Sequence, residues 1–301
     1  MNIVVYGAGA IGSLFGAILS KNNNVVLIGR KSHIEKINKD GLIVKGKTNI
    51  KKKVLSFENI KNVSSPDLMI ISVKSYDTEK TMIQAKKLIS KKTVVMSLQN
   101  GLDNIEKIEK YVSKDRIAVC ITTHGAIFSK PGVIIHTGFG KTIIGNPNGE
   151  DTNKLFDIVK IFNEAGIKTT VSDDIISEMW IKGIINSSIN PLTTIFNCKN
   201  GYLLENPILE KLVEKICKES TDIAYSYGLD LDYNEMIMKT KKVIYDTNEN
   251  FSSMLQSYKK GKKTEINSIN GILIEKGKKN NFSTFFNEIL IYMINSIIKN
   301  H

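Results

Sequence analysis

Short apolar runs alternate with longer amphipathic stretches over the first half of the chain. Runs of this length are typical of buried strands, and the stretches between them have the spacing of amphipathic helices. Strand and helix in alternation predict a mainly parallel sheet with helices on both faces. The expected strands are residues 3–6, 25–28, 68–73, 94–98 and 117–121, and the clearest helices are residues 11–20 and 78–89.

The pattern changes after Gly125, where glycine and proline punctuate the chain. Two β-rich pieces lie between these breaks, at 133–136 and 141–144, and we expect them to be antiparallel strands at a sheet edge. A helix at 153–164 and a strand at 168–171 are expected to complete the first domain.

Strand signals nearly vanish from about residue 172, and helical spacing takes over. The chain of 301 residues is long enough for two domains, each with its own core. We therefore expect an α/β fold, with a parallel-sheet domain over residues 1–170 and an all-helical domain over residues 171–301. The expected helices of the second domain are 175–189, 207–227, 233–245 and 266–275.

A glycine-rich loop follows the first expected strand and opens the first expected helix. In this position the first glycine allows a tight turn, the second lets the backbone approach a pyrophosphate, and the third permits close packing of helix on strand. The loop predicts a Rossmann-type dinucleotide-binding domain, and the alternative is a glycine-rich turn without a ligand. Its residues, with the spacing GxGxxG, are Gly7, Ala8, Gly9, Ala10, Ile11 and Gly12.

The end of the second expected strand indicates which dinucleotide is bound. A site that prefers NAD(H) places Asp or Glu about 20 residues after the glycines, where the carboxylate binds the ribose 2′-hydroxyl. Here the chain has Arg30 and Lys31 and no carboxylate. A guanidinium has forked donors that match a phosphate group. We therefore expect NADP(H) as cofactor, with Arg30 at its 2′-phosphate.

The formal net charge of +12 comes from 42 basic against 30 acidic residues. Only Arg30 and Arg116 are arginines, and the lysines are scattered along the whole chain. Proteins that read nucleic acids usually use arginine for bidentate contacts, and no apolar stretch reaches the roughly 18 residues of a membrane span. We expect neither a nucleic acid nor a membrane as partner and interpret most of the charge as a solvated, lysine-rich surface.

The cysteines and histidines favour a reduced protein without a metal site. Cys120, Cys198 and Cys217 lie far apart without a CxxC spacing, so we expect a cytoplasmic protein, and the N-terminus leads directly into a strand rather than a signal peptide. The four histidines show no metal-ligand spacing. His124 and His136 are expected to fix turns by hydrogen bonds rather than to act in catalysis.

Several separated segments form a more specific pattern than the glycine loop. In the first half they are Ser97-Leu98-Gln99-Asn100-Gly101, Thr123-His124-Gly125-Ala126, Pro131-Gly132-Val133 and His136-Thr137-Gly138. In the second half they are Trp180-Ile181-Lys182 with Asn186, Asn190-Pro191-Leu192, Ser252-Ser253-Met254-Leu255-Gln256, Thr264-Glu265-Ile266 and Ile269-Asn270-Gly271. Together with the glycine loop, these segments resemble the ketopantoate reductase (2-dehydropantoate 2-reductase) family over most of residues 1–280.

The resemblance implies an NADP-dependent oxidoreductase whose helical domain is similar to the C-terminal domain of 6-phosphogluconate dehydrogenase. The implied reaction is hydride reduction of ketopantoate to (R)-pantoate, a step in the biosynthesis of pantothenate and coenzyme A. Two alternatives stay open: an NADPH-dependent reductase of another branched 2-oxo acid, and a catalytically silent NADP-binding sensor. The oligomeric state is also open, with a homodimer as one expectation.

The resemblance also implies roles for single residues. Lys182 is the implied group that stabilises the developing alkoxide and supplies its proton, and Glu265 orients Lys182 or binds a substrate hydroxyl. Asn100 is implied to contact cofactor and substrate, and Lys74 to contact the cofactor. The implied substrate-binding positions are Asn100, Lys182, Asn186, Asn190, Asn250 and Ser253. Asn267 departs from the Asp that commonly follows the Thr-Glu-Ile segment in the family.

Residue spacing bears on these roles independently. Lys182, Asn186 and Asn190 recur every four residues, so on a helix they share one face of an otherwise apolar stretch. The alternative is a polar stripe that faces solvent. Pro191 is expected to end or kink this helix directly after Asn190.

The other implied site residues also have informative positions. Lys74 and Asn100 follow expected strands, and open parallel sheets bind ligands beyond the carboxyl ends of their strands. Asn250 and Ser253 are three residues apart, so one helix face can present both.

Overall fold

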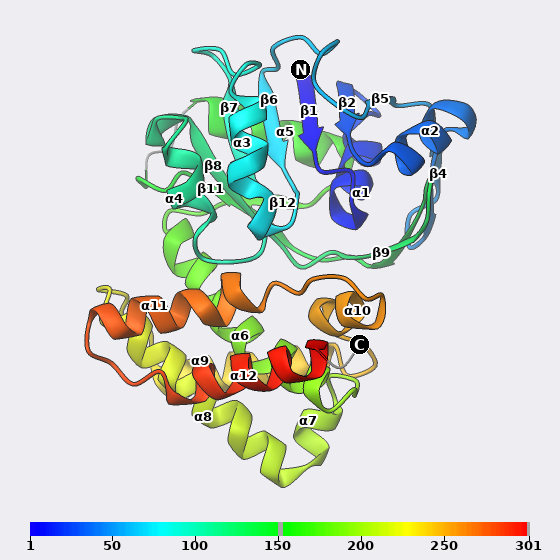
Figure 1. Ribbon diagram of the computed structural model, residues 1–301. Helices are drawn as coiled ribbons and strands as arrows, with labels where there is room; N and C mark the ends of the chain where they lie inside the picture. Colours follow the sequence, from blue (N-terminus) through cyan, green and yellow to red (C-terminus); the bar gives the residue numbers. More distant parts are fainter. Residues whose placement is uncertain (150–152, 300–301) are drawn as a thin grey trace. The chain divides into compact units, whose positions relative to one another are not determined.

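The computed structural model describes residues 1–149 and 153–299 (Figure 1). The chain forms two compact units. The first consists of Met1–Gln99 and Asn104–Ile176, and the second of Asn100–Asp103 and Ser177–His301. Each unit is described by itself below.

The first unit is built on an eight-stranded sheet in the order β12-β11-β8-β7-β6-β1-β2-β5. From β8 to β5 every neighbouring pair is parallel, whereas β11 runs antiparallel to β8 and parallel to β12. The predicted parallel sheet is confirmed. The strands are β1 (Asn2–Tyr6), β2 (Asn24–Ile28), β5 (Leu55–Phe57), β6 (Leu68–Ile71), β7 (Val94–Ser97), β8 (Ile117–Thr122), β11 (Thr142–Gly145) and β12 (Thr169–Val171).

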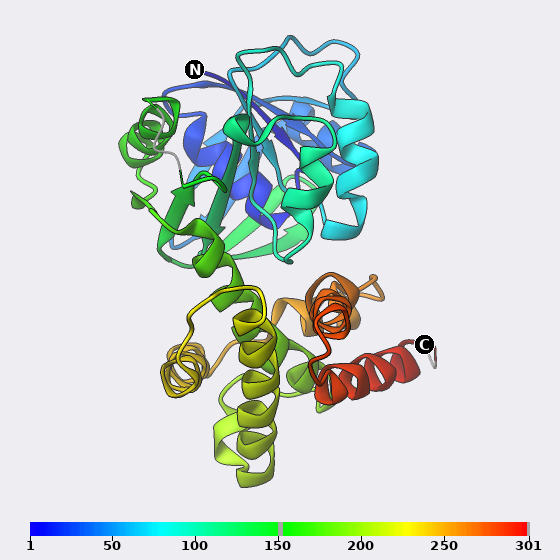
Figure 2. The ribbon, with the colours of Figure 1, turned by 90° about the vertical axis from the view of Figure 1, so that its left-hand side faces the viewer.

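Helices cover both faces of this sheet because successive strand residues point to opposite sides. On β1, Ile3 and Val5 pack in a core with Phe15 of α1 and Phe162 of α5, whereas Val4 packs in a second core that includes residues of α3 and α4. Figure 2 shows the cyan α3 and the green α5 on opposite sides of the sheet. The helices of this unit are α1 (Ala10–Leu19), α2 (Lys31–Asp40), α3 (Thr78–Ala85), α4 (Asn104–Glu109) and α5 (Asn153–Ala165), with short 3₁₀ turns η1 (Ser75–Asp77) and η2 (Lys114–Arg116).

A second, four-stranded sheet has the order β4-β3-β10-β9. The expectation that residues 133–136 and 141–144 are antiparallel strands at a sheet edge is partly wrong. Both belong to antiparallel pairs, β10 with β9 and β11 with β8, but neither is an edge strand. Residues 141–144 overlap β11, which lies between β12 and β8 in the large sheet, and 133–136 fall in β10, which lies between β9 and β3. The reason is burial, since Ile134 packs in the core that contains α1. These strands are β3 (Leu42–Gly46), β4 (Ile50–Lys52), β9 (Gly125–Lys130) and β10 (Val133–Gly138).

The second unit is helical, and over the described residues 172–299 the chain forms no strand. This confirms the all-helical prediction. None of the helices in the described part of the chain is both long and apolar enough to span a membrane. The helices are α6 (Ile175–Ile195), which begins in the first unit, α7 (Tyr202–Glu205), α8 (Pro207–Tyr225), α9 (Tyr233–Asp246), α10 (Ser253–Lys259), the π-helical turn η3 (Asn267–Gly271), α11 (Ile272–Lys279) and α12 (Phe285–Lys299).

Pro191 does not end α6, which continues to Ile195. A proline lacks the N–H that would bond the carbonyl four residues earlier, here Ser187. That carbonyl instead accepts a hydrogen bond from Asn270 Nδ2 at 3.2 Å. Of the two expected outcomes, a helix end or a kink, the helix end is therefore wrong, because a side chain distant in sequence supplies the missing donor.

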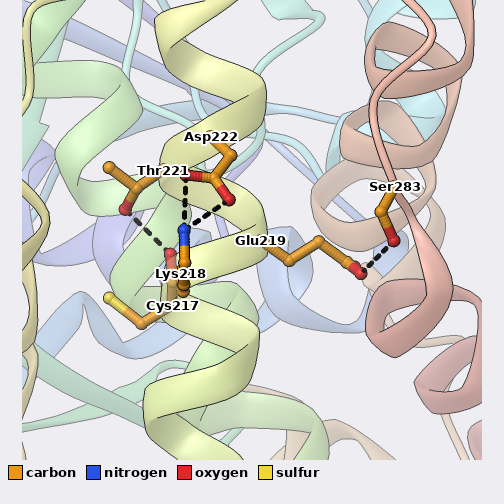
Figure 3. Close-up of polar contacts among 6 residues, drawn as sticks. All are labelled: Cys217, Lys218, Glu219, Thr221, Asp222 and Ser283. Atoms are coloured by element: carbon orange, nitrogen blue, oxygen red, sulfur yellow. Dashed lines mark hydrogen bonds and ion pairs between the residues drawn. The ribbon is translucent and has the colours of Figure 1, made fainter.

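A buried carboxylate joins α8 to α12. Glu219 Oε1 accepts from the backbone N–H and side-chain amide of Asn287, at 2.9 and 2.8 Å. Its Oε2 accepts from the Phe286 N–H at 3.0 Å. It also accepts from the Ser283 hydroxyl at 3.3 Å, a contact drawn in Figure 3. These donors include backbone N–H groups in the first turn of α12, which have no partner within the helix itself.

Candidate active site

The glycine loop between β1 and α1 has the geometry of a phosphate cradle. Gly7 has φ +116°, and a Cβ there would lie 2.5 Å from the Val73 backbone nitrogen. A Cβ on Gly12 would overlap the Gly7 carbonyl oxygen and Ser72 Oγ. At Gly9, in contrast, the nearest atom would be 3.9 Å away, and no side chain caps α1. The open N-terminus of α1 fits a pyrophosphate, which its backbone N–H groups and dipole would bind.

Arg30 lies beside this loop, at the end of β2. The N–H groups of Gly7 and Ala8 both donate to the Ile28 carbonyl, at 2.9 and 2.8 Å. A Cβ on Gly29 would be 2.8 Å from Ala8 Cβ, so glycine is needed for this approach. Arg30 is exposed, precedes α2 as its N-cap, and makes no side-chain hydrogen bond or ion pair with other described residues. Its guanidinium can therefore meet an anionic group next to the loop.

The carboxyl ends of β6 and β7 carry Lys74 and Asn100, both half-buried. Gln99, which we did not assign to the site, ties these two ends together. Its Nε2 donates to the Val73 carbonyl at 2.8 Å and to Thr78 Oγ1 at 2.7 Å. The signal was present, since Gln99 lies in the segment Ser97–Gly101 that carries the family resemblance.

In the helical unit, α6 carries Lys182, Asn186 and Asn190 on one face, as their spacing predicts. Lys182 and Asn186 are half-buried, and Asn190 is 6% exposed. The alternative interpretation, a polar stripe that faces solvent, is thus wrong for Asn190. Neither asparagine amide makes a hydrogen bond with another described residue. A buried amide without a protein partner is suited to bind a polar ligand.

Leu102 links the segments of three predicted site residues within this unit. Its side chain occupies the space that a Cβ on Gly183 would need, with Leu102 Cδ2 2.8 Å from that position. Its N–H donates to the Ser268 carbonyl at 3.4 Å. Asn100, Lys182 and Glu265 thus lie within three residues of the atoms that meet at Leu102. Gly183 and Leu102 had not been singled out from the sequence.

Glu265 is 7% exposed, a buried carboxylate at the start of the helix that continues through η3. Its carbonyl accepts from the N–H groups of Ser268 and Ile269, at 3.0 and 3.1 Å. Asn267 is exposed and is the first residue of η3. π-Helical turns inside α-helices are rare, but those that occur are often found at functional sites.

Asn250 and Ser253 do not share a helix face, because α10 begins at Ser253 and Asn250 lies in the preceding loop. The prediction that one helix face presents both residues is wrong, because the helix starts only after Ser252, whose hydroxyl caps α10 by accepting from the Leu255 N–H. Both residues are exposed. Ser252 also accepts from Thr193 Oγ1 at 2.8 Å, which holds the start of α10 against α6.

The buried histidines have structural contacts. His124 and His136 stack with ring centroids 5.3 Å apart, and His136 Nε2 lies 2.8 Å from the Gly138 carbonyl oxygen. Burial lowers the pKa of both rings, which are therefore neutral near pH 7. Within the described residues, no group of three or more His, Cys, Asp or Glu side chains could hold a metal ion.

Comparison with known proteins gives two family matches. The model described as "Ketopantoate reductase PanE/ApbA" matches residues 3–149, and "Ketopantoate reductase PanE/ApbA C terminal" matches residues 174–297. The 2-dehydropantoate 2-reductase of Pyrococcus horikoshii is 41% identical over 295 residues, which covers 96% of this chain and 95% of that protein. That of Aquifex aeolicus is 33% identical and covers 98% and 96%.

Solved structures agree over the whole chain. A PanE/ApbA family ketopantoate reductase from Ralstonia eutropha has a TM-score of 0.92 at 25% identity, covering 100% of this chain and 99% of that one. A ternary structure of D-mandelate dehydrogenase with NADH and anilino(oxo)acetate has a TM-score of 0.93 at 28% identity, with the same coverage. These findings confirm the resemblance stated from the sequence motifs: the chain belongs to the ketopantoate reductase family.

Proposed function

We propose that this protein reduces ketopantoate to (R)-pantoate with NADPH, as a 2-dehydropantoate 2-reductase of pantothenate and coenzyme A biosynthesis. The observation that carries the proposal is the face of α6 with a lysine and two amides that bond to no other residue in the described part of the chain. The relatives of the chain bear the name 2-dehydropantoate 2-reductase. In this proposal residues 1–170 bind the cofactor and residues 171–301 bind the substrate.

Bound NADPH supplies the hydride that the reaction needs. The residues of this chain then have three tasks. Lys182 donates a charge-assisted hydrogen bond to the 2-oxo oxygen and gives it a proton as negative charge develops. Asn186 and Asn190 on the same face donate to the substrate's polar groups, and Glu265 orients the Lys182 ammonium or accepts from a substrate hydroxyl. Asn100, Asn250 and Ser253 complete the proposed substrate contacts.

The proposed cofactor contacts are supported by the open geometry of the glycine loop and by the strand ends beside it. The backbone of Gly7–Gly12 binds the pyrophosphate, Arg30 pairs with the 2′-phosphate, and Lys74 and Asn100 contact the remainder of the cofactor. Arg30→Ala should lower kcat/KM with NADPH roughly tenfold or more and leave that with NADH nearly unchanged. Equal use of both cofactors by the wild type would refute the preference for NADPH.

A second candidate substrate is favoured by one comparison, the likeness to D-mandelate dehydrogenase solved with anilino(oxo)acetate. In this alternative the same site reduces a 2-oxo acid other than ketopantoate. The lysine and the amides would meet the oxo-acid group in either case, so the acyl side chain has to be tested directly.

The deciding experiment follows NADPH oxidation with ketopantoate, ketoisovalerate and an aromatic 2-oxo acid. We expect ketopantoate to have the highest kcat/KM. Lys182→Ala should lower kcat roughly 100-fold or more while NADPH affinity is retained. Lys218→Ala, on the exposed side of α8, is the matched control and should retain full activity. Higher turnover of another oxo acid would refute the substrate, and no turnover with any would favour an NADP-binding sensor.

We also propose that the protein is a cytoplasmic homodimer. No disulfide joins its cysteines within the described residues, as expected for a reducing compartment. Two aromatic side chains seven residues apart on α12, Phe285 and Tyr292, are 61% and 68% exposed and could be covered by a second copy. Sedimentation of wild type and Tyr292→Lys tests this: a monomeric wild type would refute the dimer.

A further inference from the structure

His33 is a buried histidine that joins three elements of the first unit. It lies in the first turn of α2 and is 2% exposed. Its Nδ1 accepts a hydrogen bond from the Gly132 backbone N–H, in the turn between β9 and β10, at 2.9 Å. Because Nδ1 is an acceptor, the proton of the neutral ring is on Nε2, which donates to Ser13 Oγ on α1 at 3.1 Å.

The fold requires the neutral ring. Burial lowers the pKa of His33 to about 4, and a protonated ring would present a second donor to the Gly132 N–H. The Ser13 side chain is fully buried, and the Phe128 ring lies 4.8 Å from the imidazole between centroids. Neither hydrogen bond of His33 is therefore open to solvent.

Both ends of this link are adjacent to the proposed cofactor contacts. Ser13 directly follows Gly12, the last residue of the phosphate loop. Arg30 is the N-cap of α2, and its carbonyl accepts from the N–H groups of His33 and Ile34, at 3.0 and 3.1 Å. The bond between His33 and Ser13 thus sets the distance from the start of α2, which carries Arg30, to the start of α1.

We propose that His33 is a positioning residue for NADPH, which places the Arg30 guanidinium at the 2′-phosphate by holding α2 against α1. The inference rests on the proposed function, since it presupposes that Arg30 binds this phosphate. His33 itself does not contact the cofactor. A displacement of about 1 Å is enough to weaken a bidentate contact between guanidinium and phosphate, and Arg30 has no other side-chain bond to described residues that would hold it.

The test uses the ratio of kcat/KM with NADPH to kcat/KM with NADH. The two cofactors share the pyrophosphate and nicotinamide, so any general damage to the loop or to folding cancels in this ratio. His33→Asn keeps an acceptor near the Nδ1 position for Gly132 but is too short to reach Ser13. His33→Gln extends an amide N–H toward the Nε2 position and can restore the bond to Ser13.

We expect His33→Asn to lower the cofactor ratio roughly tenfold, mainly through a higher KM for NADPH, and His33→Gln to recover most of it. Ser13→Ala removes the same bond from the other side and should lower the ratio similarly, which keeps the test decisive if a His33 variant does not fold. Asn38→Ala is the matched control: Asn38 lies in the last turns of α2 and exchanges hydrogen bonds with Ser56. It should lower stability and leave the ratio unchanged.

The outcomes separate the two claims. A wild type without preference for NADPH refutes the role of Arg30 and this inference with it. A wild type that prefers NADPH, with an unchanged ratio in both His33→Asn and Ser13→Ala, leaves the proposed function intact and refutes the positioning role. A fall in the ratio for Asn38→Ala as large as for His33→Asn also refutes it, because any loosening of α2 would then suffice.

Discussion

Removing the Glu219 carboxylate should strongly destabilise the helical unit. Glu219 lies on α8, is 6% exposed, and accepts hydrogen bonds from four donors at 2.8 to 3.3 Å. Two of the donors are backbone N–H groups at the N-terminus of α12, where a negative charge also interacts favourably with the helix dipole. In Glu219→Ala these donors lose their acceptor, and the two donors of Asn287 remain buried.

The expected loss is about 3–5 kcal/mol of unfolding free energy. Each hydrogen bond to a charged group contributes roughly 1.5–3 kcal/mol, but the four share one carboxylate and are not additive. Burial of a carboxylate offsets part of the gain, but the substitution leaves several donors without an acceptor at about 1–3 kcal/mol each for the buried ones, so the net cost is about 3–5 kcal/mol.

Urea unfolding followed by tryptophan fluorescence measures this loss. Trp180 is the single tryptophan, lies in the helical unit and is 5% exposed, so its emission reports on the unit that Glu219 stabilises. The matched control is Asp222→Ala, on the same helix, which removes an exposed ion pair with Lys218 whose side chains are 45% and 51% exposed (Figure 3). That pair should contribute about 0.5 kcal/mol or less.

A Glu219→Ala protein within about 1 kcal/mol of the wild type would refute the reasoning. So would an equal loss in Asp222→Ala, since the effect would then come from the charge of α8 and not from the bonds to α12. The stability of Glu219→Gln should lie between those of the wild type and Glu219→Ala. The amide oxygen of Gln still accepts a hydrogen bond, but its NH₂ group places donors opposite the donors of α12.

Three further predictions concern other parts of the molecule. The pKa of His33 lies at about 4 in the fold against 6.5 in the unfolded chain. The contribution of the neutral ring to stability is therefore fully present above pH 6.5 and is lost as the pH drops toward 4, by up to about 2–3 kcal/mol. The difference between the urea midpoints at about pH 7 and about pH 5 should be smaller in His33→Gln than in the wild type. Gly9→Ala should weaken NADPH binding with little change in stability. Gly12→Ala should lower NADPH affinity at least tenfold and the free energy of unfolding by about 1–3 kcal/mol. Cofactor titration and urea unfolding distinguish the two variants. Asn270→Ala should cost about 2–3 kcal/mol by leaving a carbonyl of α6 unpaired, and adding Pro191→Ala should recover about 1 kcal/mol of it by restoring a backbone N–H; strictly additive losses would contradict this.

Much of the fold could be predicted because its signals are local. The central strands of the large sheet follow from short apolar runs, and the phosphate loop from glycines at fixed spacing after a strand. The common face of Lys182, Asn186 and Asn190 follows from helical spacing alone. These features depend on neighbours within about four residues, so a single sequence is enough to read them.

The wrong expectations have a different cause. Residues 133–136 join a second sheet, and α6 passes through Pro191, because of contacts with segments far away in the chain. Asn250 is outside α10 because Ser252 caps the helix one residue before Ser253. In the first two cases the local pattern allowed more than one outcome and tertiary contacts determined which of them formed, whereas in the third the local cap was missed.

The same distinction separates the residues proposed to bind ligands from those that hold them in place. Lys182, Arg30 and the glycines lie at positions that a local pattern marks, such as a helix face or a strand end. Their supports do not: the Gly132 N–H donates to His33 across 99 positions, the Asn287 N–H to Glu219 across 68. These supports are neutral or buried groups whose sequence context is ordinary, so only the structure identifies them. It follows that a chain could keep every ligand-binding residue and still lose cofactor preference or stability through a change at His33 or Glu219, and substitutions at these two positions are where sequence comparison alone should fail first.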